Sequence, residues 1–308
     1  MPLTHSFKRL FVLLTFSTFV PAVAQVAPQT AVATNIVTAK IKLDDLSMII
    51  VPVSINGSGP YDFLLDTGCA KTIVDQKLAD ELRLTRVGER TVAGVLATAR
   101  MSVVHVSSLS VAGATVPGGD VLTSDHPATV RVRGVLGEDF LRNFDLLIDY
   151  RHQTIRFESP LSTMAQTATG EHLPLQLSGT LHGRPTYNRL VVSTHIPEFG
   201  DTPLLLLLDS GANYLTLFPA SLVQISTHQE GVRTGNFNNW VSSSAATRTV
   251  RSLSLGSNSV PDLTAVALAR RADVDTDGLI PTSLFKSVFI SARGGFVILD
   301  PSFPKTTR

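Results

Sequence analysis

The sequence carries two copies of one pattern, and this repetition constrains the possible folds more than any other feature. The first half reads YDFLLDTGCAKTIV and later RGVLGEDFLRNF, and the second half reads PLLLLLDSGANYLTLF and later DGLIPTSLFKSV. Asp66 precedes Gly134 by nearly the same number of residues as Asp209 precedes Gly278. Chance similarity between turns would not preserve that separation, so we expect two lobes that fold alike.

Short apolar runs broken by turn-forming residues predict a mostly β structure. Residues 48–55 and 61–65 flank Asn56-Gly57, a dipeptide that adopts positive φ at low cost and therefore predicts a hairpin. Residues 75–84, with leucines at helical spacing, are the clearest candidate for a helix. The fold class that follows is all-β, with two homologous barrel-like lobes.

The first residues are typical of a secretory signal. Basic Lys8 and Arg9 precede an apolar run at 10–20, which is followed by Ala22-Val23-Ala24. The run is about half of the roughly 20 residues that a membrane-spanning helix needs, so cleavage is favoured over an uncleaved anchor. We therefore expect a periplasmic or secreted protein with no stable membrane insertion after cleavage.

Composition excludes several functions. Lys and Arg total 26 against 25 Asp and Glu, so no strong field favours nucleic acid as a partner. Cys69 is the only cysteine, which excludes an internal disulfide and a cysteine-based zinc cluster. The histidines form no close metal-binding pair, so we expect no metal. The predicted domains are a signal peptide at 1–24, an N-terminal lobe at 25–165 and a C-terminal lobe at 166–308.

Each copy places an aspartate directly after an apolar strand. Burying an ionised carboxylate there is costly unless other groups stabilise it, so Asp66 and Asp209 need a functional reason. Glycine lets the backbone pass close to a partner, and a hydroxyl can form hydrogen bonds across a two-fold interface. If the lobes face each other, the two carboxyl groups meet. The residues expected to support the two turns are Thr67, Gly68, Ser210 and Gly211.

These residues resemble the pepsin-like and retropepsin-like aspartic peptidases, whose two halves each supply an Asp-Thr/Ser-Gly turn and a downstream apolar-apolar-Gly segment. Val135-Leu136-Gly137 matches that segment, and Leu279-Ile280 matches its apolar pair. The resemblance implies the aspartic peptidase fold with an active cleft between the lobes. It also implies an endopeptidase in which Asp66 and Asp209 activate one water without a cofactor. The substrate would be a peptide or protein.

The resemblance further implies a β-hairpin flap over the substrate. By position, the flap of the first lobe lies around residues 91–103 with Gly94 near its tip, and the second lobe's matching region is 231–250, containing Trp240. The alternative for Trp240 is a packed surface aromatic. One chain carries both turns, so we expect a monomer.

Other readings remain open at this point. The main alternative is a non-catalytic peptide-binding protein on the same scaffold. Asp273, Asp275 and Asp277 imitate the start of a calcium-binding loop, but position twelve is Leu284 rather than Glu. A Cys69 nucleophile is conceivable, although a small buried residue is the commoner role at such a position.

Two departures from the family pattern carry a prediction. Pro281 replaces the closing Gly, and we expect the apolar pair still to support the second turn. Cys69 and Ala212 stand where pepsin-type enzymes usually have a hydroxyl that stabilises the carboxylate, so the pKa values of the dyad should be higher than in pepsin. Peptide cleavage is therefore expected to peak nearer neutral pH. A pH profile that peaks below about pH 3, under the ordinary pKa of aspartate, would contradict this.

Overall fold

The computed structural model describes residues 36–93, 98–125, 132–176, 180–181, 184–185, 189–218, 228–236, 239–268 and 276–303. Strands dominate, as predicted. An eight-stranded sheet from the first half has the order β2-β3-β4-β9-β5-β8-β7-β6, and β3 also pairs with β7, which curls the sheet toward a barrel. Its strands are β2 (Lys42–Leu43), β3 (Ile49–Ile55), β4 (Ser58–Leu65), β5 (Ile73–Asp75), β6 (Thr85–Ala93), β7 (Thr98–Val111), β8 (Ala114–Ser124) and β9 (Gly134–Leu136).

A seven-stranded sheet from the second half repeats this plan, with the order β15-β16-β21-β17-β20-β19-β18. β4 and β9 are parallel, as are β16 and β21, and both β5–β8 and β17–β20 are parallel too. The repeated sequence pattern therefore corresponds to a repeated strand order. The strands are β15 (Val191–Thr194), β16 (Leu204–Asp209), β17 (Leu215–Leu217), β18 (His228–Asn236), β19 (Asn239–Leu255), β20 (Asn258–Ala267) and β21 (Gly278–Pro281).

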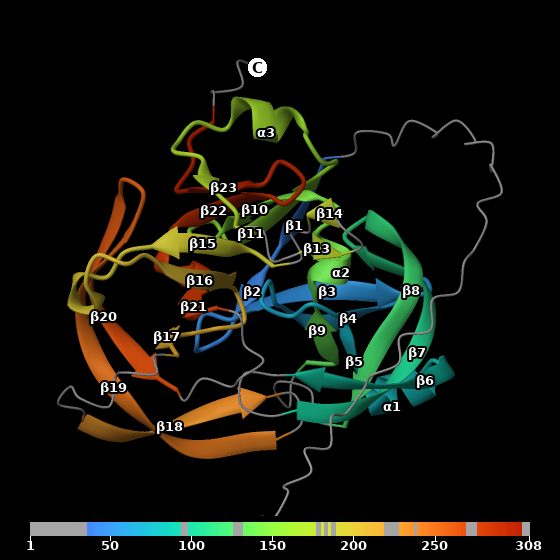
Figure 1. Ribbon diagram of the computed structural model, residues 1–308. Coiled ribbons are helices and arrows are strands. Elements are labelled where there is room, and N and C mark those ends of the chain that lie inside the picture. The colour runs from blue at the N-terminus through green and yellow to red at the C-terminus, as the bar shows by residue number, and fades with distance from the viewer. Residues whose placement is uncertain are drawn as a thin grey trace, which may run out of the picture. The chain divides into compact units, whose positions relative to one another are not determined.

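A third sheet of six strands takes members from both halves, and a small two-stranded sheet completes the set. In Figure 1 the first-half strands (blue to green) and the second-half strands (yellow to orange) lie on either side, with this third sheet beside both. Because it joins both halves, the boundary at residues 165 and 166 stays a prediction. The remaining strands are β1 (Val37–Lys40), β10 (Asp145–Asp149), β11 (Thr154–Glu158), β12 (Leu173–Pro174), β13 (Thr180–Leu181), β14 (Arg184–Pro185), β22 (Ser287–Ser291) and β23 (Phe296–Leu299).

Both local predictions are confirmed. Asn56 and Gly57 have positive φ values of 52° and 78° and connect β3 to β4. The predicted helix at 75–84 is α1 (Gln76–Glu81), which buries Leu78 and Ala79. The other short helices are α2 (Glu138–Leu141), α3 (Thr163–Thr167), and the 3₁₀ turns η1 (Pro197–Phe199) and η3 (Thr282–Leu284).

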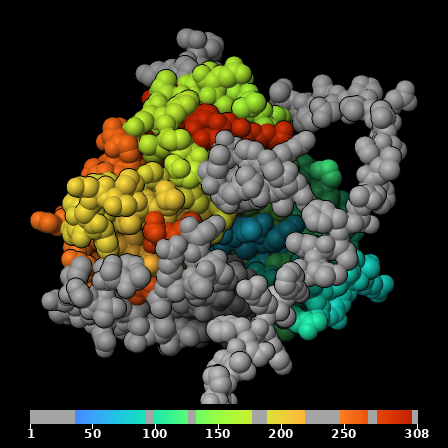
Figure 2. Space-filling view, in the orientation of Figure 1, coloured from blue at the N-terminus to red at the C-terminus, as the bar shows by residue number. Residues whose placement is uncertain are grey.

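The third sheet is stabilised by a buried network of side-chain hydrogen bonds as well as by the backbone hydrogen bonds between its strands. The Asp145 side chain is fully buried, and its Oδ1 accepts a hydrogen bond from Ser291 Oγ at 2.8 Å. Its Oδ2 accepts from the backbone N–H and the hydroxyl of Ser162, both at 3.0 Å. A buried carboxylate satisfied in this way joins β10 to β22 and to the start of α3. Figure 2 shows the light green residues around α3 next to the red ones near the C-terminal end.

The core depends on aromatic packing behind the shared sheet. Phe140 and Phe157 are fully buried, with ring centroids 6.1 Å apart, and Phe144 lies 5.4 Å from Phe157. These rings join α2 to β11. They therefore connect the segment that follows β9 to the sheet shared by the two halves.

Phe157→Ala should lower the free energy of unfolding by about 3–5 kcal/mol, because it removes a buried ring and leaves a cavity. Val87→Ala is the matched control: Val87 is 51% exposed, so its truncation should change stability by no more than about 0.5 kcal/mol. Urea unfolding followed by circular dichroism measures both. Equal effects from the two substitutions would mean that the aromatic cluster is not part of the stabilising core.

Candidate active site

Asp66 lies at the point where β4 leaves the first sheet. β4 runs parallel to β9, with Leu65 opposite Leu136, and the Asp66 N–H donates to the Leu136 carbonyl at 3.0 Å. The turn then folds back, because Gly68 N–H donates to Asp66 Oδ1 at 2.8 Å. The carboxylate is thus held by its own turn, at the buried end of β4 and beside the buried strand β9.

Asp209 occupies the same place in the second sheet. β16 runs parallel to β21, with Leu208 opposite Ile280 and Asp209 opposite Pro281. Gly211 N–H donates to Asp209 Oδ1 at 2.7 Å, which reproduces the first turn. Pro281 therefore does not disrupt the second turn, and the apolar pair supports it as expected.

The two turns hold each other through exchanged hydrogen bonds. Thr67 Oγ1 donates to the Leu208 carbonyl at 2.8 Å and accepts from the Ser210 N–H at 2.9 Å. Ser210 Oγ does the same in reverse: it donates to the Leu65 carbonyl at 2.9 Å and accepts from the Thr67 N–H at 3.0 Å. Both side chains are buried, so four backbone groups depend on two hydroxyls. The predicted two-fold interface is present.

The glycines after these residues explain how the carboxyl groups come so close. A Cβ added to Gly68 would lie 2.5 Å from Asp209 Cγ, and one added to Gly211 would lie 2.6 Å from Asp66 Cγ. No side chain fits in that space, so each turn passes directly against the opposite carboxyl group. The two carboxyl groups lie close enough that each influences the pKa of the other. This geometry brings together all six residues expected at the two turns.

Burial and mutual repulsion shift the titration of this pair. Asp66 and Asp209 are only 7% and 8% exposed. Loss of solvation by burial, and then the negative charge of Asp209, raise the pKa of Asp66 well above its ordinary value. Burial also raises the pKa of Asp209, against the opposing effects of Gly211 N–H, the neighbouring Asp66 and the charge of Arg189. Two such groups hold one proton between them over a wide pH range.

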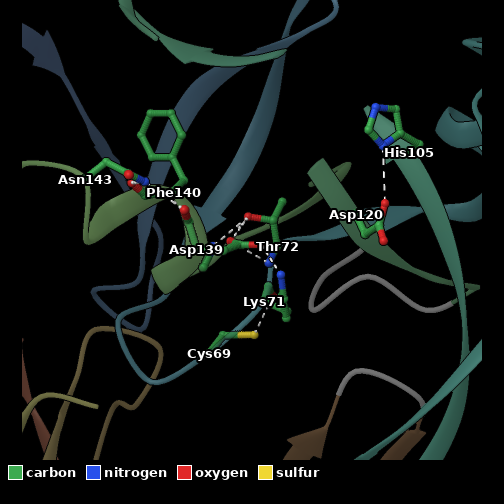
Figure 3. A network of polar contacts seen from close by, with 9 residues as sticks. Cys69, Lys71, Thr72, His105, Asp120, Asp139, Phe140 and Asn143 are labelled. Atoms are coloured by element: carbon green, nitrogen blue, oxygen red, sulfur yellow. Dashed lines mark hydrogen bonds and ion pairs between the residues drawn. The ribbon is translucent and has the colours of Figure 1, made fainter. Parts of the chain in front are cut away.

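The loop after Asp66 is fixed by a second network, which sequence reasoning missed (Figure 3). Asp139 Oδ1 accepts from the N–H of Thr72 at 2.9 Å and from its hydroxyl at 2.6 Å. The Thr72 hydroxyl in turn accepts from Gly137 N–H at 3.2 Å. α2 is thereby tied to the Asp66 turn. The sequence offered one signal for this network: two acidic residues, Glu138 and Asp139, follow Gly137 at the end of the apolar-apolar-Gly segment.

Cys69 does not take the role of a nucleophile in this arrangement. Its Sγ donates to the Lys71 carbonyl at 3.0 Å. Burial, and then the charge of Asp66, raise the pKa of the thiol well above its ordinary value. The thiolate that would attack a substrate is therefore disfavoured.

The two hairpins predicted as flaps are present as strand pairs. β6 pairs with β7 up to Ala93 opposite Thr98, and Gly94 lies outside the described residues. β18 pairs with β19, and the backbone of Trp240 lies opposite Gly235, while the Trp240 side chain lies outside the description. Their role over a substrate stays a prediction.

The structure describes the calcium-like stretch only in part. Asp273 and Asp275 of the calcium-like stretch lie outside the described residues, and Asp277 N–H donates to the Leu205 carbonyl beside β16. In the ranges that the structure describes, no helix is both long and apolar enough to span a bilayer.

Comparison with known proteins gives matches over part of the chain. Residues 51–140 match the family model described as aspartyl protease, a stretch that contains the Asp66 turn and Gly137. Among solved structures, the chain is similar to a retropepsin-like aspartic protease from Rickettsia conorii, with 14% identity over 41% of this chain and 94% of that chain and a TM-score of 0.32. No curated protein matches.

The match to residues 51–140 agrees with the resemblance inferred from the two turns, which is to the aspartic peptidases. The structure is all-β, as expected. The family is one of protein-cleaving hydrolases, and that is the level of function that the match supports. Asp209 lies beyond the matched residues, so its place in the site comes from the geometry described above.

Asp66→Asn should stabilise the folded protein progressively as pH rises from about 4 to 7. Since the pKa of Asp66 is raised above its ordinary 3.8, the folded state keeps a proton that the unfolded chain releases, and parent stability falls as pH rises through this window. Asn cannot ionise and avoids that loss. Melting temperatures of parent and variant across this range measure the gap.

Asp62→Asn is the control, since Asp62 is 41% exposed and paired with Lys42 at 2.9 Å. It should produce no gain that grows with pH, because a screened surface pair contributes little. A constant difference between Asp66→Asn and the parent from pH 4 to 7 would mean that the Asp66 carboxyl titrates normally in the folded protein.

Proposed function

We propose that this protein is an aspartic endopeptidase that hydrolyses peptide bonds with one water activated by the Asp66 and Asp209 dyad. The observation that carries the proposal is the contact between two buried carboxyl groups, each at the end of an apolar strand. Keeping two repelling carboxyl groups in contact costs stability, and a purely structural site could use neutral side chains instead. The cost is explained if the shared proton is used in catalysis.

The chemistry follows from one proton held between two groups. The ionised carboxyl accepts a proton from the water as its oxygen attacks the carbonyl carbon of the peptide bond. The protonated carboxyl donates to the carbonyl oxygen, where negative charge would otherwise develop. A tetrahedral diol results. Its collapse breaks the C–N bond as the nitrogen receives a proton from one carboxyl of the dyad, while the other carboxyl takes a proton from a hydroxyl of the diol. The pair returns to its starting state of one proton.

The backbone supplies the positioning that this mechanism needs. Gly68 and Gly211 N–H groups fix one oxygen of each carboxyl, so the carboxyl groups keep their orientation before substrate arrives. The Thr67 and Ser210 exchange below them resists separation of the two turns. Such preorganisation places general acid and general base without a rearrangement during the reaction.

We also propose that the protein acts outside the cytoplasm, as a monomer, on peptides or proteins. The segment 1–24 has the basic, apolar and small-residue regions of a secretory signal. One chain supplies both aspartate turns, so a second copy is not needed to complete the dyad. Size-exclusion chromatography and N-terminal sequencing of the exported protein test these two points.

Asp66→Asn and Asp209→Asn should each reduce peptide cleavage by at least about a hundredfold, because either change removes half of the acid–base pair. The measurement is kcat/KM on a mixed peptide library at the parent's optimum pH, with and without a pepstatin-like inhibitor. Asp62→Asn, away from the dyad and exposed, is the control and should retain parent activity.

Cleavage by either dyad variant at the parent rate would overturn the mechanism. A parent that binds peptides but cleaves none across the pH range would instead favour the alternative, a peptide-binding protein on this scaffold.

A further inference from the structure

The two turns of the dyad are supported in different ways. In the first half, the Gly137 N–H donates to the Thr72 hydroxyl at 3.2 Å. In the second repeat, Pro281 takes the place of Gly137 and Leu215 takes the place of Thr72. Proline has no N–H and leucine has no hydroxyl, so the same hydrogen bond cannot form there. The end of β21 must therefore be held in another way.

Tyr150 provides a hydrogen bond at this place from the other half of the chain. Its hydroxyl is hydrogen-bonded to Thr282 Oγ1. Thr282 is fully buried and directly follows Pro281, the residue opposite Asp209 in the β16–β21 pair. The Tyr150 backbone N–H also donates to the Lys286 carbonyl at 3.0 Å. Tyr150 is therefore joined by both its backbone and its side chain to the residues that follow β21.

The shared sheet fixes the position of Tyr150. The residue directly follows β10, and β10 pairs with β22 up to Asp149 opposite Ser287. Burial is the main cause that raises the pKa of Tyr150, with the Thr282 hydrogen bond acting against it and the charge of Asp209 adding to it. The phenol therefore keeps its proton near pH 7, and it lies close enough to the dyad to respond to the charge of Asp209.

We propose that Tyr150 is a positioning residue for the dyad: through Thr282 it holds the end of β21, and with it the second turn, in place relative to the first turn. This inference rests on the proposed function, since it adds a residue to that mechanism. The path runs from the Tyr150 hydroxyl to Thr282, through the backbone to Pro281, and across the β16–β21 pair to Asp209. Loss of the hydroxyl should let the second turn shift, and a small displacement of a reacting group lowers the rate strongly.

Two substitutions test this hydrogen bond from either side. Tyr150→Phe and Thr282→Val each remove one hydroxyl and nearly keep the size of the side chain. Either should lower kcat by about tenfold and change KM by less than about twofold, because the bond places an acid–base group and does not bind substrate. The double variant should be no slower than the slower single variant, since both changes break the same bond. Urea unfolding followed by circular dichroism establishes that each assayed protein is folded.

Two control variants leave the hydrogen bond intact. Thr282→Ser keeps a hydroxyl and should keep kcat within about twofold of the parent. Tyr61→Phe makes the same chemical change in a half-buried tyrosine that packs against the core, and it should leave kcat unchanged. A loss of kcat in Thr282→Ser as large as in Thr282→Val would overturn the proposal. Parent-like kcat in Tyr150→Phe, or additive losses in the double variant, would do the same.

Titration of the dyad gives a readout that a merely structural role would not move. It is followed through the ¹³C chemical shifts of the aspartate carboxyl carbons in labelled protein. In the parent, the two carboxyl groups should titrate in two separate steps, because each repels the charge of the other. Tyr150→Phe should bring the two midpoints closer together, since this coupling weakens as the carboxyl groups move apart. Unchanged midpoints would overturn the proposal, whatever the substitution does to stability.

The titration needs no turnover, so it separates this inference from the proposed function. A parent that cleaves no peptide would overturn the proposed function, while the effect of Tyr150 on the dyad would still be measured.

Discussion

The close approach of the Asp66 and Asp209 carboxyl groups is the constraint that the rest of this structure must satisfy. Asp66 and Asp209 repel when both are ionised, and each loses solvation where it lies. No local turn could hold them together, because each turn belongs to a different sheet. The lobes must therefore be locked to each other at the point of greatest repulsion. The exchanged bonds of Thr67 and Ser210 do this immediately below the carboxyl groups.

The third sheet also holds the two halves of the chain together. β10 and β22 pair over their full lengths, from Asp145 opposite Ser291 to Asp149 opposite Ser287. Each half therefore adds strands to a common sheet, and the hydrogen bond from Ser291 to Asp145 crosses the same boundary in a fully buried place. Such an interface resists sliding, because a shift by one residue would turn buried side chains outward. The dyad geometry is thus set by the fold as well as by the turns.

Sequence alone predicted much of this arrangement, because the two halves repeat their signals. The Asp-Thr-Gly and Asp-Ser-Gly turns, the apolar pairs and the Asn56-Gly57 hairpin are local patterns, and the structure has them where expected. The shared sheet was not predicted, because strand pairing across halves depends on contacts that no local pattern reveals.

Glu138 shows a similar limit. A charged residue beside Asp139 suggests an exposed helix start, yet α2 leaves Glu138 only 5% exposed, and burial raises its pKa to about 8. Both chemical identity and spacing were visible in the sequence, but burial was not. Tertiary packing decides whether such a group is solvated, and that decides its charge.

The repeated strand order has an evolutionary consequence. When a site is assembled from two identical subunits, every substitution appears on both sides of the axis, and the two acids must remain equivalent in the empty enzyme. Here the halves are encoded separately, so Thr67 and Ser210 can differ although they make matching hydrogen bonds. Carrying both repeats in one chain thereby permits the two halves of the site to differ.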